Sequence, residues 1–302
     1  MKGAKIQRSP NKAIEKTQGK VKVLGFNLFY RIFRPESYKG TLVCLHGGPG
    51  ATHDYILPLA DLASYGFRVI FYDQLGCGRS DLPKDHALFT VERAVEELDA
   101  FRKALSLGRI HLMGSSYGGM LAIAYALKYQ RNLKSIITTG GLASVPLTAA
   151  EMQRLKSQLP RKIRRTLERY EARGEYSNPS YEKAVMFFYK KHLLRLRKWP
   201  PEQNYTMAHL SKPVYFTMNG PNEFTIIGNT RYWDVTDQLP KIRVPALVTG
   251  GKHDEVTPKV ARSIHRGIKG SKLVTFQKSS HLPMWEERRK YTQTLRRFLL
   301  SV

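Results

Sequence analysis

Residues 110–121 read IHLMGSSYGGML and place two serines side by side among glycines. An apolar run with the character of a buried strand leads into them, and an apolar segment suited to a buried helix follows. The pentapeptide at 114–118, GSSYG, fits the pattern Gly-x-Ser-x-Gly with Ser116 at its centre. In a strand–turn–helix context this pattern is typical of a nucleophile elbow, in which a sharp bend exposes the central serine.

The neighbouring residues decide between the two serines. A strand that turns directly into a helix brings its backbone close to other chain segments, so the positions two before and two after the nucleophile must be small. Ser116 has Gly114 and Gly118 at these positions, whereas Ser115 would have methionine and tyrosine. We therefore predict that Ser116 is the nucleophile. The alternative is a glycine-rich turn with no chemical role.

Short apolar runs that stop at glycine or polar residues recur on both sides of this stretch. They lie at residues 41–46, 68–73, 109–114, 134–141, 244–251 and 272–277. Continuous runs of this kind indicate parallel strands that are covered on both faces. Helical patterns at 90–105 and 120–130 alternate with them. The sequence therefore predicts an α/β fold with a doubly wound, mostly parallel sheet.

The alternation of strands and helices stops between residues 143 and 236, a stretch rich in Arg, Lys, Tyr, Glu and Pro. We interpret residues 143–236 as a helical cap inserted between two parts of the sheet domain, 20–142 and 237–302, because too many helical segments intervene for one crossover. The alternative is that these helices extend the layers over the sheet. Residues 1–19 are expected to form a basic, mobile N-terminal tail.

Composition narrows the classes of function. The chain has 302 residues, a formal net charge of +26 and two cysteines, Cys44 and Cys77. Two cysteines do not suggest a disulfide framework, and neither a signal peptide nor an apolar run of about 18 residues is present, so we expect a cytoplasmic protein without membrane association. The positive charge would suit an acidic partner or nucleic acid. Because no zinc-finger spacing or RNA-binding aromatic signature accompanies it, we favour a basic solvated surface and do not expect nucleic-acid binding.

A serine hydroxyl is a weak nucleophile and needs a general base that is oriented by an acid. In chains with this elbow, the acid and then the histidine follow the serine. His281 follows the last apolar run, and Asp254 follows the run before it. We assign His281 as the general base and Asp254 as the orienting acid. Glu255 is the competing candidate for the acid.

The third requirement is an oxyanion hole. The segment HGGPG at 46–50 follows the first of the parallel runs, where one backbone N–H donor is expected. Pro49 has no N–H, so we assign Gly48 as this donor and Tyr117, the residue after the nucleophile, as the other. The alternative is a turn whose glycines serve only its tightness.

Several motifs taken together resemble those of a known family, and the resemblance covers about residues 20–302. The motifs are HGGPG (46–50), YDQLGCGRS (72–80), GSSYGG (114–119), NGPNEF (219–224), GKHDEVTP (251–258) and SSHLPMWE (279–286). They look like the proline iminopeptidase family, a branch of the α/β-hydrolase serine peptidases, and in particular its archaeal tricorn-interacting members. The resemblance implies the α/β-hydrolase fold with an inserted helical cap.

The resemblance also implies an activity. It implies a serine aminopeptidase that releases N-terminal residues, including proline, through an acyl-enzyme and without a cofactor or metal. The partners would be short peptides with a free N-terminus, and the enzyme would cooperate with a larger upstream protease such as tricorn. Glu223 and Glu255 match the family positions that bind the substrate's α-ammonium group. The alternative is that Glu223 caps a helix and Glu255 is a solvated loop charge.

Other classes of function remain as rivals at this point. A general serine esterase or acyl hydrolase would share the triad but would not need Glu223 and Glu255. A non-catalytic binding module would use the basic surface alone. A metallo-aminopeptidase is disfavoured because the chain has no HExxH motif and its nine histidines show no ligand spacing.

Overall fold

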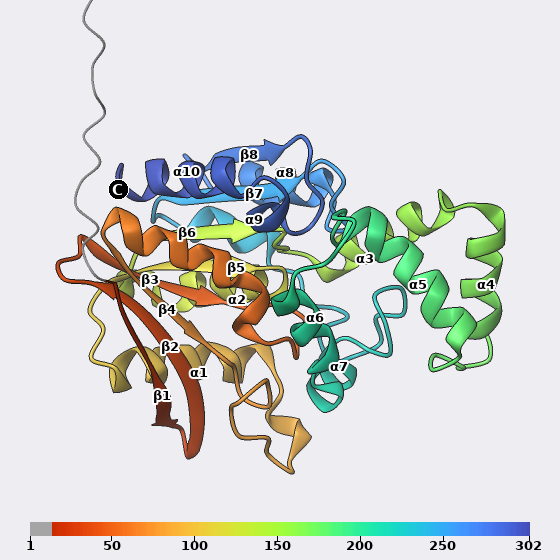
Figure 1. The fold of residues 1–302 in the computed structure, drawn as a ribbon, viewed down its shortest axis with the longest axis horizontal. Helices are drawn as coiled ribbons and strands as arrows, with labels where there is room; N and C mark the ends of the chain where they lie inside the picture. The colour runs from red at the N-terminus through yellow and green to blue at the C-terminus, as the bar shows by residue number, and fades with distance from the viewer. Residues whose placement is uncertain (1–13) are drawn as a thin grey trace, which may run out of the picture.

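One sheet of eight strands, covered by helices on both faces, organises the computed structural model, which describes residues 14–302 (Figure 1). The strands span β1 (Ile14–Val23), β2 (Phe26–Pro35), β3 (Gly40–Leu45), β4 (Phe67–Tyr72), β5 (Ile110–Ser115), β6 (Leu133–Thr139), β7 (Ala246–Gly251) and β8 (Lys272–Phe276). Their order in the sheet is β1-β2-β4-β3-β5-β6-β7-β8. The β1–β2 and β2–β4 pairs are antiparallel, and every other pair is parallel. The predicted mostly parallel sheet is confirmed.

The hairpin at one edge of the sheet corrects the expected N-terminal boundary. β1 begins at Ile14, so residues 14–19 belong to a strand and not to a tail. The remainder of the expected tail, residues 1–13, lies outside the described residues. Most β1 side chains are exposed, so the strand shows no apolar run, and its pairing with β2 holds it in place.

Helices cover the two faces of the sheet and also lie between β6 and β7. On one face lie α1 (Val91–Ala104), α2 (Tyr117–Tyr129) and α8 (Pro258–Gly267), and on the other lie η1 (His53–Tyr65), α9 (Pro283–Glu286) and α10 (Arg288–Leu299). Between β6 and β7 come α3 (Val145–Ser157), α4 (Arg161–Glu171), α5 (Pro179–His192), α6 (Pro201–Ala208) and α7 (Lys212–Met218). Three short 3₁₀ turns are η2 (His86–Leu88), η3 (Gln130–Asn132) and η4 (Thr236–Lys241). Within residues 14–302, no helix combines the length and hydropathy needed to cross a membrane.

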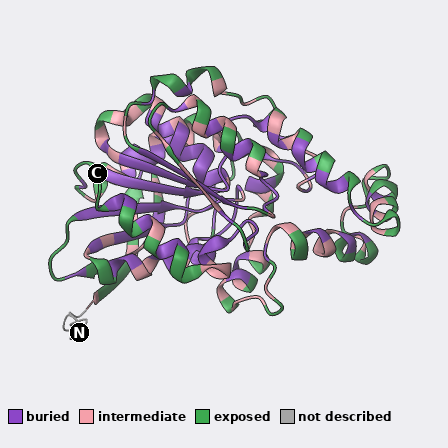
Figure 2. Cartoon of the chain, turned by 90° about the horizontal axis from the view of Figure 1, so that it is seen from above, coloured by how far each residue is buried: buried purple, intermediate pink, exposed green. Residues whose placement is uncertain are grey.

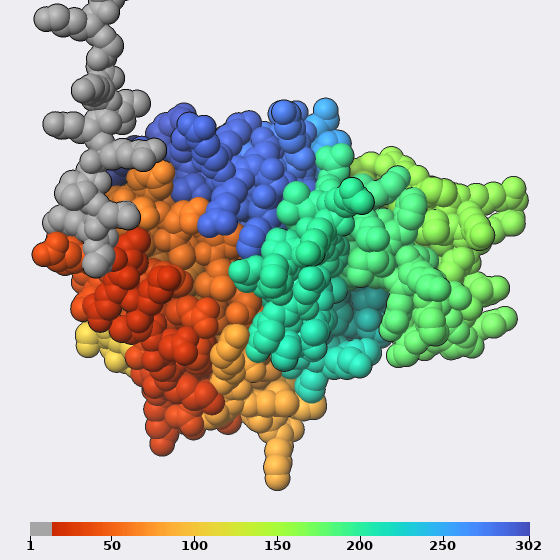
Figure 3. Space-filling view, in the orientation of Figure 1, coloured from red at the N-terminus to blue at the C-terminus, as the bar shows by residue number. Residues whose placement is uncertain are grey.

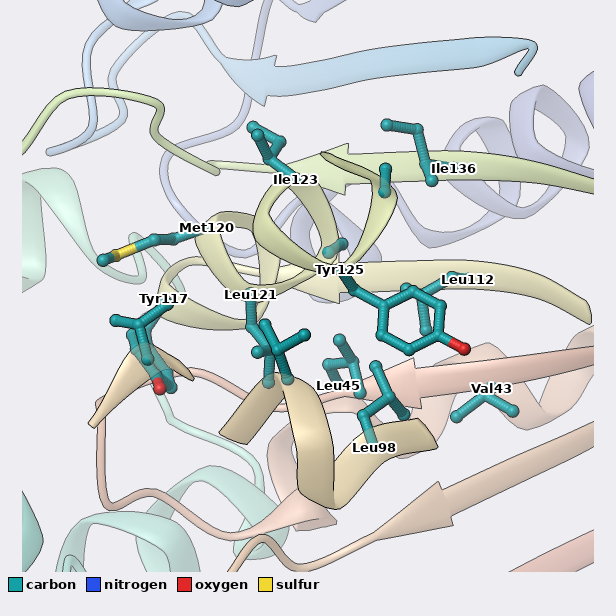
Figure 4. Close-up of a cluster of buried hydrophobic side chains, with 14 of the residues drawn as sticks. Val43, Leu45, Leu98, Leu112, Tyr117, Met120, Leu121, Ile123, Tyr125 and Ile136 are labelled. Atoms are coloured by element: carbon teal, nitrogen blue, oxygen red, sulfur yellow. The ribbon is translucent and has the colours of Figure 1, made fainter. Parts of the chain in front are cut away.

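Alternating side chains of the central strands build two cores, which explains the continuous apolar runs. Val43 and Leu45 of β3 pack with α1 and α2, whereas Leu42 and Cys44 face η1 and α10. The strands therefore lie at the buried centre of the molecule (Figure 2). Figure 4 shows Leu121 of α2 in the same cluster as Leu45. Each such fully buried side chain contributes about 1.5–3 kcal/mol relative to an exposed one.

Helices α3 to α7 form a separate layer beyond the carboxyl ends of the strands (Figure 1). Their bounds fall within the range 143–236. Side chains of α3, α4 and α5 make a small apolar core of their own, in which Leu167 and Phe188 are fully buried. In the space-filling view, α3, α4 and α5 project as one end of the molecule (Figure 3). This cap thus faces the edge of the sheet at which α/β proteins build their sites.

Candidate active site

Ser116 occupies the bend between β5 and α2. β5 ends at Ser115 and α2 begins at Tyr117, and Ser116 between them has φ 57° and ψ −126°. Its backbone N–H donates to the carbonyl of Thr139 in the adjacent strand β6 at 2.9 Å. A non-glycine residue in this conformation is strained, and it persists only where the surrounding structure fixes it.

The glycines beside Ser116 are required for close approach of backbones. A Cβ atom on Gly114 would collide with the carbonyl oxygen of Gly118. A Cβ atom on Gly118 would in turn collide with the carbonyl oxygen of Leu45 at the end of β3. The structure therefore confirms the predicted steric reason for small residues two positions before and after Ser116.

His281 and Asp254 form a buried pair on the loops that follow β8 and β7. His281 Nδ1 lies 2.6 Å from Asp254 Oδ1, and the same oxygen accepts the N–H of Val256 at 2.8 Å. Burial lowers the pKa of His281, but the charge of Asp254 and this hydrogen bond outweigh burial and raise the pKa to about 9. The pair is arranged so that Asp254 orients the imidazole and stabilises its charged form.

One backbone carbonyl group of the cap binds both of these loops. The backbone oxygen of His192, the last residue of α5, accepts the N–H of Glu255 at 3.2 Å and the N–H of His281 at 3.1 Å. The loop before His281 is fixed on its other side by Glu286, which accepts the Ser280 N–H at 2.5 Å. Glu286 also accepts the N–H of Arg195, just beyond α5, at 2.8 Å.

The HGGPG segment leaves one well-placed backbone donor. The N–H of Gly47 donates to the hydroxyl of Tyr55 at 2.8 Å and is therefore engaged. Pro49 has no N–H, which leaves the N–H of Gly48 among these three residues. Tyr117 is the first residue of α2, where the N–H has no intrahelical partner and the helix dipole favours negative charge.

Two glutamates lie next to His281. Glu255 Oε1 is 3.9 Å from His281 Nε2. Glu223 Oε1 accepts a hydrogen bond of 2.7 Å from the hydroxyl group of Tyr215. Burial raises the pKa of Glu255 to about 8. Burial also raises the pKa of Glu223, although the Tyr215 hydroxyl and His281 oppose the shift. Burial thus disfavours the charged form of both carboxyl groups, and a nearby cation favours it.

One pocket brings the predicted residues together. Its lining includes Gly48, Ser116, Glu223, Glu255 and His281. Asp254 lies behind the imidazole of His281, and Tyr117 contributes its backbone at the elbow while its side chain is buried in the core. Apolar groups complete the wall. Within residues 14–302, no group of three or more His, Cys, Asp or Glu side chains is arranged to hold a metal ion.

Cap helix α6 forms part of this wall and is fastened to the sheet domain. The hydroxyl of Thr206 in α6 lies 2.8 Å from that of Thr52 at the start of η1. The guanidinium of Arg79 lies over the ring of Tyr205 at 4.9 Å and makes two hydrogen bonds, of 2.9 and 3.1 Å, to Asp54. These contacts fix the distance between α6 and the segment that carries Gly48.

Comparison with known proteins assigns the family. Residues 40–288 match the model of the alpha/beta hydrolase fold. The chain is 51% identical to a proline iminopeptidase of Saccharolobus solfataricus over 96% of this chain and 94% of that protein. It is 50% identical to one from Thermoplasma volcanium, covering 93% and 96%. A solved proline iminopeptidase of Mycobacterium smegmatis is 34% identical, with a TM-score of 0.88 and coverage of 94% and 98%.

The chain belongs to the proline iminopeptidase family. Its match to these relatives includes the cap, and the α/β-hydrolase fold expected from the motifs is confirmed.

Several residues of the pocket carry no motif that marks them in the sequence. Tyr189 of α5, Gln203 of α6 and Tyr215 of α7 all line the pocket. Each comes from a different cap helix, so only the packing of the cap brings them together. The Glu223 and Glu255 positions could be named because both stand inside motifs shared with the proline iminopeptidase family. The role of the His192 carbonyl could not be predicted from a motif, because every residue type carries the same backbone carbonyl group.

Proposed function

We propose that this member of the family is a serine aminopeptidase that releases N-terminal residues, including proline, from short peptides. The observation that carries the proposal is the pair of glutamates, Glu223 and Glu255, in the pocket that also contains Ser116 and His281. An α-ammonium group is the cation that an N-terminal exopeptidase must hold beside the scissile bond. A pair of unit charges 4 Å apart is worth about 4 kcal/mol at an effective dielectric near 20, before the desolvation cost. The activity named for the relatives agrees with this proposal.

In the proposed reaction, Ser116 Oγ attacks the carbonyl carbon of the first peptide bond while His281 Nε2 takes the hydroxyl proton. Asp254 stabilises the imidazolium, and the N–H groups of Gly48 and Tyr117 bind the oxyanion. The intermediate collapses when His281 protonates the leaving nitrogen and the C–N bond breaks. Water, deprotonated by His281, then releases the first residue from the acyl-enzyme and restores the serine.

The glutamates select for a free N-terminus in this proposal. Approach of the ammonium group favours the ionised form of Glu255 and Glu223, whose pKa values are raised in its absence. The bound cation then fixes the carbonyl of the first residue one carbon atom away, above Ser116. Binding energy from the ammonium group thus positions the scissile bond.

We also propose that the substrates are short peptides with a free N-terminus, and that a larger upstream protease supplies them. The cap supports short peptides as substrates because it covers the pocket and limits entry. We further propose a reducing cytoplasm as the location of the protein. The unpaired, buried thiols of Cys44 and Cys77 are consistent with this location.

The test uses proline and alanine arylamides of aminomethylcoumarin, each with a free and an acetylated amine. We expect the wild type to cleave only the free-amine substrates and Ser116→Ala to cleave none. Equal turnover of the acetylated substrates would contradict the ammonium pocket and favour a broad acyl hydrolase. Absence of turnover in the wild type would contradict the proposed activity itself.

Glu223→Gln tests the ammonium pocket directly. The neutral amide still accepts a hydrogen bond from Tyr215 but loses the charge that attracts the ammonium group. We expect kcat/KM for the proline arylamide to fall about 10- to 100-fold, the range of a charge-assisted hydrogen bond. Turnover of a nitrophenyl ester without an ammonium group should stay within about twofold, and an equal loss on both substrates would contradict the role.

A further inference from the structure

The wall of the pocket formed by α6 contains a buried side-chain amide whose oxygen has no partner within the described residues. Gln203 is 3% exposed and lines the pocket together with Ser116 and Glu223. Within residues 14–302 its Oε1 atom has no hydrogen-bond partner. A buried acceptor left unpaired costs about 1–3 kcal/mol, so such an atom in a pocket wall is satisfied when a ligand brings a donor.

Gln203 is held rigidly enough to recognise one position of a ligand. Thr206 lies one turn further along α6 and is bonded to Thr52, and Tyr205 is stacked under Arg79. Both contacts reach the sheet domain, so the amide is positioned relative to Ser116 and not merely relative to the cap. A donor that binds Gln203 therefore pays little additional ordering cost.

The substrate backbone has few hydrogen-bond donors, and each lies at a different position along the peptide. An N-terminal proline carries donors only on its ammonium nitrogen, and the proposed function directs these to Glu223 and Glu255. Every other backbone N–H of the peptide lies on the leaving side of the scissile bond. The nitrogen of the scissile bond must remain accessible to His281, which protonates it. The next N–H, between the second and third residues, is the first donor that is free to bind elsewhere.

We propose that Gln203 Oε1 accepts a hydrogen bond from the peptide N–H between the second and third residues of the substrate. This inference rests on the proposed aminopeptidase function and adds a subsite for the leaving peptide to it. The two glutamates stand on segments that follow α7 and β7, whereas Gln203 stands on α6, which packs on η1. Peptides of three or more residues are then better substrates than dipeptides or arylamides.

The test compares three substrates with the wild type and Gln203→Met, which keeps the side-chain length and removes the acceptor. The substrates are Pro-Ala-Ala, a depsipeptide in which an ester oxygen replaces the N–H between the second and third residues, and a proline arylamide. Release of proline is measured for each. We expect the wild type to cleave Pro-Ala-Ala with a kcat/KM about tenfold above that of the depsipeptide. In Gln203→Met this preference should vanish, and the loss of kcat/KM on the arylamide should be smaller than the loss on Pro-Ala-Ala.

Gln238→Met, at an exposed position outside the pocket, is the matched control and should keep the preference. A wild type that cleaves both peptides equally would overturn the inference without any variant, even if Gln203→Met fails to fold. An equal loss on all three substrates in Gln203→Met would also overturn it, because the residue would then support the pocket as a whole. Wild-type enzyme that cleaves none of the three would overturn the proposed function and this subsite together.

Discussion

At the scale of single residues, Glu255 affects His281 and is also part of the proposed ammonium site. Its Oε1 atom is 3.9 Å from His281 Nε2, and its charge adds to that of Asp254 in raising the pKa of the histidine. A general base must be neutral to accept a proton, so activity increases as the pH rises through the pKa of His281. Removal of the Glu255 charge removes one of the interactions that stabilise the imidazolium.

Glu255→Gln should therefore move the rising limb of the pH profile to lower pH. The suitable readout is kcat/KM for a nitrophenyl ester without an ammonium group, measured from pH 6 to 10, because ester binding does not need the glutamate. Glu182→Gln, at an exposed position of α5, serves as the control. An unchanged limb, or a limb moved to higher pH, would show that Glu255 does not influence the base.

At the scale of elements, the loops after β7 and β8 depend on groups outside themselves. The carbonyl of His192 binds both loops, and Glu286 of α9 binds the residue before His281. The Glu286 carboxylate also accepts the Ser280 hydroxyl at 2.9 Å. Loss of these bonds would leave His281 free to drift from the geometry that proton transfer requires.

Glu286→Ala should lower kcat by about tenfold or more, because displacements of an ångström in a catalytic group have effects of this size or larger. KM for the proline arylamide should change less, since Glu286 is not among the residues that line the pocket. The comparison variant is Glu168→Ala at an exposed position of α4. A rise in KM with kcat unchanged would place the role of Glu286 in binding instead.

Elements differ in how far the sequence predicts them. β3 to β7 carry runs of buried apolar residues because both of their faces are covered, whereas β8 at the sheet edge is only partly buried. The predicted runs coincide with these strands to within a few residues. Residues 14–19 of β1 were not predicted as a strand, because an exposed edge strand is defined by its pairing and not by its hydropathy. Ser116, Asp254 and His281 could be assigned from their places after strands. Gln203 could not, because its environment depends on the packing of the cap.

At the scale of the whole molecule, Arg79 is one of the side chains that join the cap to the sheet domain. Its guanidinium makes two bonds to Asp54, lies 3.5 Å from Asp73, and stacks between Phe29 of β2 at 5.3 Å and Tyr205 of α6 at 4.9 Å. A planar guanidinium can make these contacts together, whereas an ammonium group cannot. The position of α6, and with it one wall of the pocket, depends on this side chain.

Arg79→Lys should raise KM for the proline arylamide about three- to tenfold with a smaller change in kcat, because α6 would lose its stacked partner while the loop of His281 keeps its own supports. Steady-state kinetics on the purified variant measures both constants. Arg173→Lys, at an exposed position beyond α4, should behave as the wild type. An unchanged KM would mean that the contact between Thr52 and Thr206 is enough to hold α6 in position without the stacking of Arg79.

The cap lies between β6 and β7, and this order has a consequence during protein synthesis. Gly48 and Ser116 precede the cap along the chain, and Asp254 and His281 follow it. A polypeptide still being translated therefore exposes a serine without a base until the strands β7 and β8 have been made. Hydrolytic capacity begins only when the last part of the sheet has joined the first, so incomplete chains cannot act on other peptides in the cell.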